Sequence, residues 1–117
     1  MGLSGRAKKL SIYVGEADMY EGRPLWEALV EQARTAGCAG ATVLRGCGGF
    51  GATSRKHAKH KLRMSVDHPL LVHVVDRPDK ITALAEVYAA MVGDGLMTVE
   101  DVNVMFYRGG VTGGPEE

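Results

Sequence analysis

The sequence has few of the features that mark membrane proteins, secreted proteins or redox enzymes. No uninterrupted apolar run approaches the roughly 18 residues that a membrane helix needs, and the start of the chain lacks the apolar region of a signal peptide. Only two cysteines occur, Cys38 and Cys47, and their spacing fits neither a C-x-x-C redox motif nor a zinc knuckle. We therefore expect a cytoplasmic protein with free thiols and no transmembrane segment.

Aromatic residues are scarce, at 6% of the chain, and none lies between Phe50 and Tyr88. The 14 basic residues are matched by 14 acidic ones, so the formal net charge is zero. Proteins that bind single-stranded nucleic acid usually combine a positive surface with aromatic side chains that stack on bases. These absences predict that the protein does not bind nucleic acid.

Acidic residues are missing from the middle of the chain, between Gln32 and Val66. This stretch carries the basic residues Arg34, Arg45, Arg55, Lys56, Lys59, Lys61 and Arg63. Such a local basic element faces an anion or an acidic partner, or it is a solvated loop. We predict that its second half, Arg55 to Arg63, binds a partner protein.

The 117 residues, 45% of them apolar, suit one globular domain. Alternating and helical apolar patterns predict six elements in the order strand, helix, strand, strand, helix, strand. They cover residues 10–14, 24–36, 41–45, 70–75, 81–92 and a last strand that begins near Met97. This order is that of an α+β, ferredoxin-like βαββαβ domain, in which a four-stranded antiparallel sheet carries two helices on one face.

We expect a single domain over residues 1–117, with an ordered core at about 8–107, a loop at 47–68 and a flexible tail at 109–117. Gly37 is placed to cap the first helix at its C-terminal end. In the last strand the apolar positions change phase, which predicts a β-bulge near Glu100 and Asp101.

The sheet face opposite the helices is predicted to be more apolar than a solvated face should be. Its expected members are Ser11, Tyr13, Thr42, Leu44, Leu71, Val75, Met105 and Tyr107. An exposed apolar face of this kind usually packs against another subunit. The sequence therefore predicts an oligomer whose subunits pack sheet against sheet.

A glycine cluster runs from Gly46 to Gly51 and matches G-x-G-x-x-G. A dinucleotide-binding fold needs an acidic residue about 20 positions on, at the end of the next strand, but Asp67 precedes that strand and Asp76 comes too late. The lysine of a phosphate-binding P-loop is also missing. What remains is a backbone whose N–H groups are open to an anion, with Arg55 nearby as a countercharge. The alternative is a hinge for the loop that follows.

Two alternatives place other chemistry on this chain. His57 and His60 are spaced to share a metal ion, with His68 or Cys47 as further ligands, although the neighbouring lysines oppose a divalent cation. Carboxylates at Glu16, Asp18 or Asp94 could serve an enzyme as acid or base. No nucleophile and base are recognisable as a pair, so we expect a protein that is not an enzyme.

The chain resembles a known family, the domain of unknown function 190, which is grouped with the nitrogen-regulatory PII-like proteins. The resemblance runs from about Leu10 to Val104 and rests on five motifs. They are Ile12-Tyr13-Val14-Gly15-Glu16, Tyr20-Glu21-Gly22-Arg23-Pro24-Leu25, Ala39-Gly40-Ala41-Thr42-Val43-Leu44-Arg45-Gly46, Gly49-Phe50-Gly51 and Met91-Val92-Gly93-Asp94-Gly95-Leu96. It implies a ferredoxin-like subunit, a homotrimer, and a long mobile loop between the second and third strands.

The PII resemblance also implies ligand-binding residues, because PII proteins bind adenine nucleotides in clefts between subunits. The positions that carry it over are Thr42, Gly49-Phe50-Gly51, the phosphate-binding turn Gly93-Asp94-Gly95, and Arg108 in place of a later arginine pair. The open backbone of the glycine cluster adds Gly46 and Gly48 to the candidate ligand residues, together with Arg55. Leu96 stands where PII proteins have a phosphate-binding lysine. Losing such a charged contact costs roughly one to two decades of affinity. The resemblance as a whole implies a small anionic ligand, with an adenine nucleotide as the leading candidate.

Overall fold

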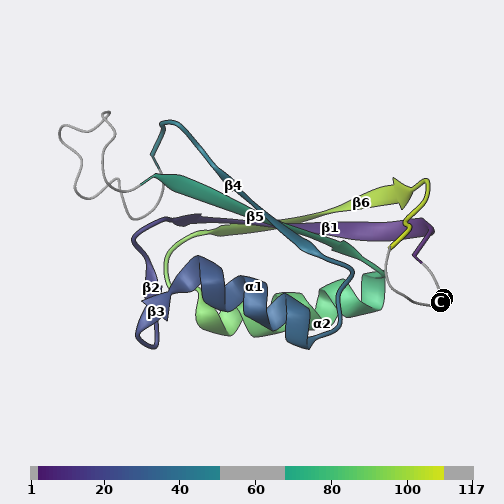
Figure 1. Ribbon diagram of the computed structural model, residues 1–117, viewed down its shortest axis with the longest axis horizontal. Coiled ribbons are helices and arrows are strands. Elements are labelled where there is room, and N and C mark those ends of the chain that lie inside the picture. The colour runs from purple at the N-terminus through teal and green to yellow at the C-terminus, as the bar shows by residue number, and fades with distance from the viewer. Residues whose placement is uncertain (1–2, 51–67, 110–117) are drawn as a thin grey trace.

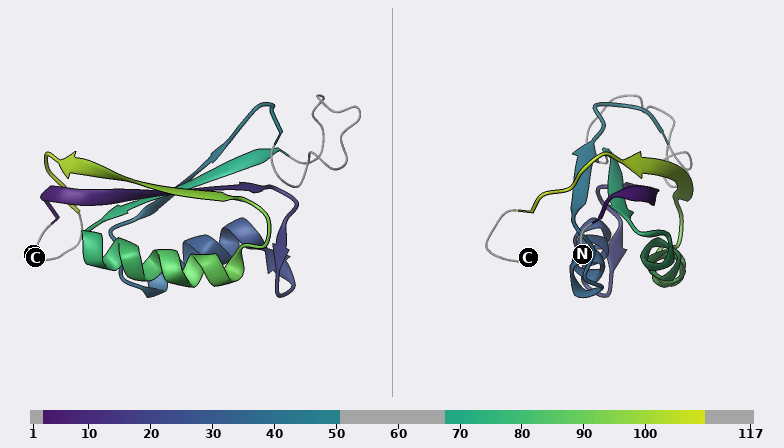
Figure 2. Two further views of the ribbon diagram at one scale, coloured as in Figure 1. Left: turned by 180° about the vertical axis from the view of Figure 1, so that it is seen from behind. Right: turned by 90° about the vertical axis from the view of Figure 1, so that its right-hand side faces the viewer.

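The structure is a computed structural model that describes residues 3–50 and 68–109. Two helices lie side by side and cover one face of a four-stranded sheet (Figures 1 and 2). The main elements are β1 (Gly5–Gly15), α1 (Leu25–Thr35), β4 (Ala41–Arg45), β5 (Pro69–Asp76), α2 (Pro78–Met91) and β6 (Leu96–Val104). The predicted loop 47–68 and the tail beyond Gly109 lie mostly outside the described residues.

The strands of the sheet run in the spatial order β4-β5-β1-β6, and every neighbouring pair is antiparallel. Strands β5 and β1 lie side by side at the centre of the sheet although they are not consecutive in the chain. The ferredoxin-like arrangement requires this. The α+β, ferredoxin-like βαββαβ fold predicted from the sequence is confirmed.

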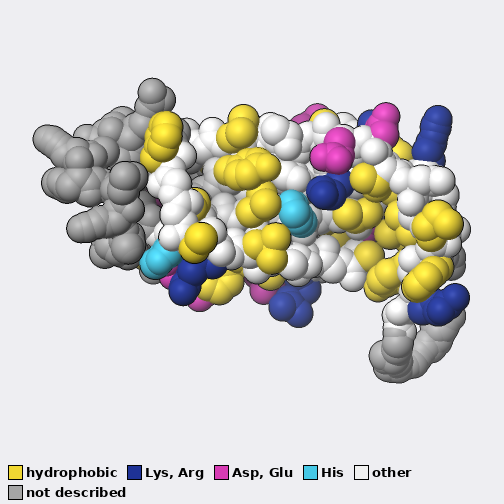
Figure 3. Space-filling view, turned by 90° about the horizontal axis from the view of Figure 1, so that it is seen from above, with side chains coloured by type: hydrophobic (Ala, Val, Ile, Leu, Met, Phe, Trp, Pro, Cys, Tyr) yellow, Lys and Arg dark blue, Asp and Glu magenta, His cyan; other side chains and the backbone are white. Residues whose placement is uncertain are grey.

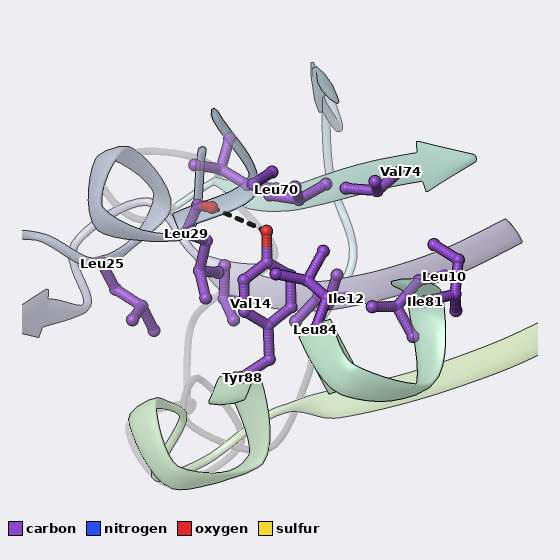
Figure 4. Close-up of a cluster of buried hydrophobic side chains, with 12 residues drawn as sticks. Leu10, Ile12, Val14, Leu25, Leu29, Leu70, Val74, Ile81, Leu84 and Tyr88 are labelled. Carbon is purple, nitrogen blue, oxygen red and sulfur yellow. Dashed lines mark hydrogen bonds between the residues drawn. The ribbon is translucent and has the colours of Figure 1, made fainter. Parts of the chain in front are cut away.

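The core lies between the sheet and the helices (Figure 4). Each central strand contributes alternate residues to it, because successive side chains of a strand point to opposite faces. Each helix contributes one apolar stripe at spacings of three and four residues. The buried residues at the centre are Leu10, Ile12, Val14, Leu25, Leu29, Ala33, Leu70, Val72, Val74, Ile81, Leu84 and Tyr88.

Helix α1 ends as the sequence predicts, at Gly37. This glycine has φ of 78° and donates its N–H to the carbonyl of Arg34 at 3.0 Å. Cys38 then donates to the carbonyl of Ala33 at 3.1 Å. The two bonds form a Schellman motif, in which glycine adopts the left-handed conformation that other residues avoid. Helix α2 begins at Pro78, where a missing N–H costs nothing.

A short hairpin, β2 (Met19–Tyr20) with β3 (Arg23–Pro24), occupies a stretch that the sequence pattern places in a loop. Its two turn residues, Glu21 and Gly22, have φ of 48° and 83°. Positive φ at both positions is the requirement of a type I′ turn, one of the two hairpin turns whose twist matches that of the strands. Glutamate is an unusual residue for the first of these positions, so the sequence carries only half of the usual signal.

The predicted β-bulge near Glu100 and Asp101 is wrong, because β6 pairs with β1 in unbroken register from Leu96 to Val104. The apolar positions change phase for a different reason. Strand β5 ends opposite Lys8, so β1 and β6 continue beyond it as a two-stranded ribbon. There the helix-side position is taken by the ion pair between Lys8 and Asp101, and the apolar residues of β6 turn to the opposite face.

The chain after β6 turns back toward the start of β4 (Figure 2). The Tyr107 hydroxyl donates to the carbonyl of Ala39 at 3.2 Å. Met105 and Tyr107 therefore follow the sheet rather than belonging to its strands. Among the helices of the described residues, none is both long enough and apolar enough to cross a membrane.

Candidate functional site

The first part of the candidate site is the glycine-rich stretch Gly46–Phe50, which follows directly on β4. Gly46 donates its N–H to the carbonyl of Pro69 at 2.7 Å, and a Cβ here would lie 2.9 Å from the Pro69 ring. Gly48 and Gly49 have nothing within 4 Å of the place where a side chain would begin. Phe50 is 70% exposed. The stretch is therefore held in place at Gly46, and the space beside the backbone is open at Gly48 and Gly49.

The second part is the exposed turn Gly93-Asp94-Gly95, which connects α2 to β6. A Cβ on Gly95 would lie 2.7 Å from the carbonyl oxygen of Tyr13, so only glycine lets the turn approach the end of β1. Gly93 has nothing within 4 Å. This turn thus presents an open backbone against the central strand.

The two glycine-rich parts lie at the same end of the sheet but on opposite edges. Their strands are joined by one cross-strand row, in which Leu44 of β4 faces Leu71, Leu71 faces Tyr13, and Tyr13 faces Leu96 of β6. Strands β5 and β1 stand between the two edges. Three strand spacings amount to roughly 14 Å. One chain therefore presents two half-sites rather than a single cleft.

Thr42 and Arg108 lie elsewhere. Thr42 is exposed on the face opposite the helices, where it pairs with His73. Arg108 follows the end of β6 that pairs with the start of β1, so it lies at the other end of the sheet from both glycine-rich parts. Its guanidinium stacks 4.1 Å from the centre of the Phe106 ring. Within one chain, the structure does not bring Arg108 to the other predicted ligand residues.

A charged cluster at the base of the glycine-rich stretch has a role that the sequence reasoning missed. Glu16, first considered only as an acid or base, accepts from Arg45 at 2.6 Å and contacts Nδ1 of His68 at 3.0 Å. Partial burial raises the pKa of Glu16, but the hydrogen bond with His68 and the charge of Arg45 outweigh it and lower that pKa overall. Asp18, beside it in sequence, accepts from the N–H of Gly15 at 2.9 Å.

The sheet face opposite the helices, here called the outer face, is exposed in one chain (Figure 3). The strand registers place six of the eight predicted members on it, namely Ser11, Tyr13, Thr42, Leu44, Leu71 and Val75. Tyr13, Leu44 and Leu96 are 44%, 49% and 56% exposed, which is high for large apolar side chains on a sheet. Their row forms an apolar band across all four strands.

A polar row crosses the outer face next to the apolar band. It consists of Thr42, His73, Ser11 and Thr98, one from each strand. Partial burial lowers the pKa of His73, and the charge of Lys9 lowers it further against the opposing effect of Glu100. The imidazole therefore favours its neutral form.

A separate cavity of about 300 Å³ lies between α1 and β4, lined by Val30, Ala33, Arg34 and residues 38–41. Burial raises the pKa of the Cys38 thiol, and the charge of Asp76 adds to this. The thiol is thus less reactive than an ordinary one. None of the predicted ligand residues lines this cavity.

Several predicted residues fall outside the described part of the chain: Gly51, Arg55, Lys56, His57, Lys59, His60, Lys61 and Arg63. The structure therefore does not test the predicted partner-binding loop or the two candidate metal-binding histidines. Within residues 3–50 and 68–109, no group of three or more His, Cys, Asp or Glu side chains could hold a metal ion.

The sequence matches the family model of domain of unknown function 190, described as "Uncharacterized ACR", over residues 7–104. The match spans the main sheet and both helices, apart from the first two residues of β1, and it includes both glycine-rich parts. The chain belongs to the DUF190 family. Two relatives carry the name UPF0166 protein. The one from Aquifex aeolicus is 37% identical over 103 residues, covering 86% of this chain and 95% of its own. The one from Methanocaldococcus jannaschii is 32% identical over 106 residues, covering 89% and 94%.

Solved structures place this DUF190 protein in the PII-like fold. CPII from Thiomonas intermedia K12, bound to ADP and bicarbonate, superposes with a TM-score of 0.59 at 20% identity, covering 85% of this chain and 88% of its own. A second CPII structure, bound to ADP, AMP and acetate, gives a TM-score of 0.57 at 19% identity, covering 86% and 89%. CPII is described as a nitrogen regulatory PII-like protein. At this identity the likeness concerns the fold.

Proposed function

We propose that this DUF190 protein is a PII-like regulatory protein, not an enzyme, that binds a small anionic ligand between subunits of a homotrimer. The leading ligand is an adenine nucleotide. The observation that carries the proposal is the placement of the two glycine-rich parts, Gly46–Phe50 and Gly93–Gly95. They lie at one end of the sheet on opposite edges, so a second copy is needed to complete a cleft that uses both.

The outer face supports the oligomer. Its apolar band of Leu44, Leu71, Tyr13 and Leu96 ends, on each edge, next to a glycine-rich part. Packing that band against other copies removes large apolar side chains from water. It also brings the β4 edge of one subunit near the β6 edge of another. The same packing therefore accounts for both the covered face and the completed cleft.

The nucleotide is supported by two observations of different kinds. Glycine-rich backbone with open space beside it, as at Gly48, Gly49 and Gly93, suits phosphate oxygens. The PII-like neighbour CPII carries ADP and AMP in its solved structures. The position of Leu96 argues for a contact set different from that of PII proteins, because a leucine cannot pair with phosphate.

The direct test combines oligomer mass with calorimetric titration of ADP, AMP, ATP and cyclic AMP. Gly48→Asp and Gly93→Asp each place a negative charge in open space beside one half-site, and neither position requires positive φ. Each substitution should weaken binding by about tenfold or more. Gly40→Asp is the matched control, since its site is equally open but lies at the far end of β4.

The outcomes separate the parts of the proposal. Loss of affinity in both aspartate variants supports a cleft made from two copies. Loss in only one of them contradicts a shared cleft, and a wild-type trimer that binds none of the four nucleotides removes the nucleotide from the proposal. Turnover of a nucleotide in the same samples would show that the protein is an enzyme.

We further propose that the basic stretch Arg55, Lys56, Lys59, Lys61 and Arg63 binds a partner protein. Its charge, without any nearby acidic residue, supports an acidic partner surface. A variant with Lys56, Lys59, Lys61 and Arg63 changed to glutamine, and Arg55 kept as the countercharge of the glycine cluster, should keep the oligomer mass and the nucleotide affinity. Proteins recovered with the wild type, with and without ADP, should be lost from the variant, and recovery of the same proteins with both contradicts this role.

A further inference from the structure

The end of β1 lies at the centre of the candidate site, between the two half-sites. Glu16 follows β1 directly, and its two carboxylate oxygens contact different elements. Oε2 accepts from Nη2 of Arg45, the last residue of β4, at 2.6 Å. Oε1 lies 3.0 Å from Nδ1 of His68, the residue before β5. One carboxylate thus bridges both chain segments on which the 46–68 region begins and ends.

Backbone hydrogen bonds reinforce the same three-way junction. The N–H of Glu16 donates to the carbonyl of His68 at 2.8 Å, and the N–H of Gly46 donates to the carbonyl of Pro69 at 2.7 Å. Neither bond reaches Arg45. The Glu16 side chain is therefore what ties the last residue of β4 to the end of β1.

The environment of Glu16 makes this contact more than an ordinary surface ion pair. The Glu16 and His68 side chains are 30% and 28% exposed, whereas the Arg45 side chain is 59% exposed. The pKa of Glu16 lies below its usual value, as described above. The carboxylate is therefore charged at neutral pH and partly shielded from water. By contrast, the pair between Glu31 and Arg34 on α1 is 3.5 Å long, with side chains 52% and 74% exposed.

The same strand end also meets the second half-site. Tyr13 of β1 pairs with Leu96, and its carbonyl oxygen lies 2.7 Å from where a Cβ on Gly95 would be. Residues 13–16 therefore contact the turn on one side and the base of Gly46–Phe50 on the other. These four consecutive residues therefore connect the two half-sites.

From these contacts we infer that Glu16 is a positioning residue of the ligand site. Its carboxylate holds Arg45 and His68 in place, so that the open backbone at Gly48 and Gly49 is oriented before the ligand arrives. The part of the inference that concerns ligand binding rests on the proposed function. The holding of Arg45 and His68 in the ligand-free protein does not depend on it.

The sign of the effect separates positioning from simple electrostatics. Removing a negative charge next to an anion site should strengthen anion binding if charge alone matters. If Glu16 positions the stretch, its loss should weaken binding, because the ligand must then restore the bound arrangement. Glu16→Gln removes the charge and keeps the side-chain length. Glu31→Gln is the matched control, with the same chemical change in the exposed pair on α1.

Two measurements on the full-length protein test the inference. Amide hydrogen exchange without ligand reports on the bonds donated by Gly46 and Glu16. In Glu16→Gln we expect about three- to fivefold faster exchange at Gly46. The affinity for ADP should fall by about the same factor. Both values should stay at the wild-type level in Glu31→Gln.

Each result decides one part. Unchanged exchange in Glu16→Gln overturns the holding role, and faster exchange with unchanged or tighter ADP binding overturns the positioning role. If wild-type protein binds no ADP, the proposed function fails, while the exchange comparison still decides the holding role. If Glu16→Gln does not fold, Arg45→Gln breaks the same contact from its exposed side and should show the same faster exchange at Gly46.

Discussion

The Tyr88 hydroxyl donates a 2.6 Å hydrogen bond to the carbonyl oxygen of Leu29 and so joins the two helices inside the core (Figure 4). Tyr88 is fully buried, and burial raises its pKa well above the usual range. A buried phenol without a partner would be costly, and the bond removes that cost. The contact sets how α2 lies against α1.

Removing only this bond should have a modest effect. We expect Tyr88→Phe to lower the free energy of unfolding by about 1 kcal/mol, the usual value of one neutral hydrogen bond. Tyr88→Ala also removes the ring from the core and should cost about 3 to 5 kcal/mol. Urea unfolding measures both, at one fixed protein concentration because an oligomer's stability depends on it. Equal losses in the two variants would contradict this account.

Gly95 should tolerate no side chain. A Cβ there would lie 2.7 Å from the backbone oxygen of Tyr13, which cannot move aside as a flexible side chain can. We expect Gly95→Ala to cost about 1 to 3 kcal/mol in unfolding free energy. Gly93→Ala, two residues earlier with nothing within 4 Å, is the control and should be close to neutral.

The outer face should decide the oligomeric state. We expect Leu44→Glu to dissociate the oligomer, because it places a charge in the apolar band. Val87→Glu is the matched control, since Val87 is 41% exposed on α2 and Leu44 is 49% exposed on the outer face. Sedimentation analysis of the wild type should give a trimer. A Leu44→Glu protein with the wild-type mass would show that the band is not the interface.

His73 should make stability depend on pH. Its pKa is lowered in the folded protein by partial burial and by Lys9, partly offset by Glu100. The unfolded chain therefore binds a proton more readily than the folded one just below the ordinary histidine pKa. The contribution of His73 to the free energy of unfolding is complete above the ordinary histidine pKa. It shrinks as the pH falls from that pKa to the lower pKa of the folded protein, and then levels off.

Urea unfolding of wild type and His73→Gln between about pH 5 and 8 checks this prediction. The wild type should lose more stability than the variant on acidification. The difference between the two curves isolates His73 from the chain's other histidines. Parallel curves would mean that His73 does not change its pKa on folding.

Local patterns in the sequence are sufficient for most of the fold. Alternation in 10–14, the short apolar run 70–75 and the helical stripe of α2 identify these elements because such patterns are typical of buried strands and amphipathic helices. Gly37 marks the end of α1 because few other residues adopt its conformation. The β2–β3 hairpin is harder to predict because Glu21 takes a conformation usually left to asparagine or glycine. The phase change in β6 misleads because the sequence does not show where β5 ends.

The candidate site also has features that local sequence patterns determine and features that only the tertiary structure decides. The sequence by itself determines the glycine-rich stretches, the basic segment and the apolar outer face, since each is a property of neighbouring or regularly spaced residues. Only the tertiary structure places Gly46–Phe50 and Gly93–Gly95 on opposite edges of one sheet end, and Arg108 at the other end. Only it brings Glu16 to Arg45 and His68, which are 29 and 52 residues away in the chain. Strand order and register decide such contacts, and neither can be deduced from a single segment of the sequence.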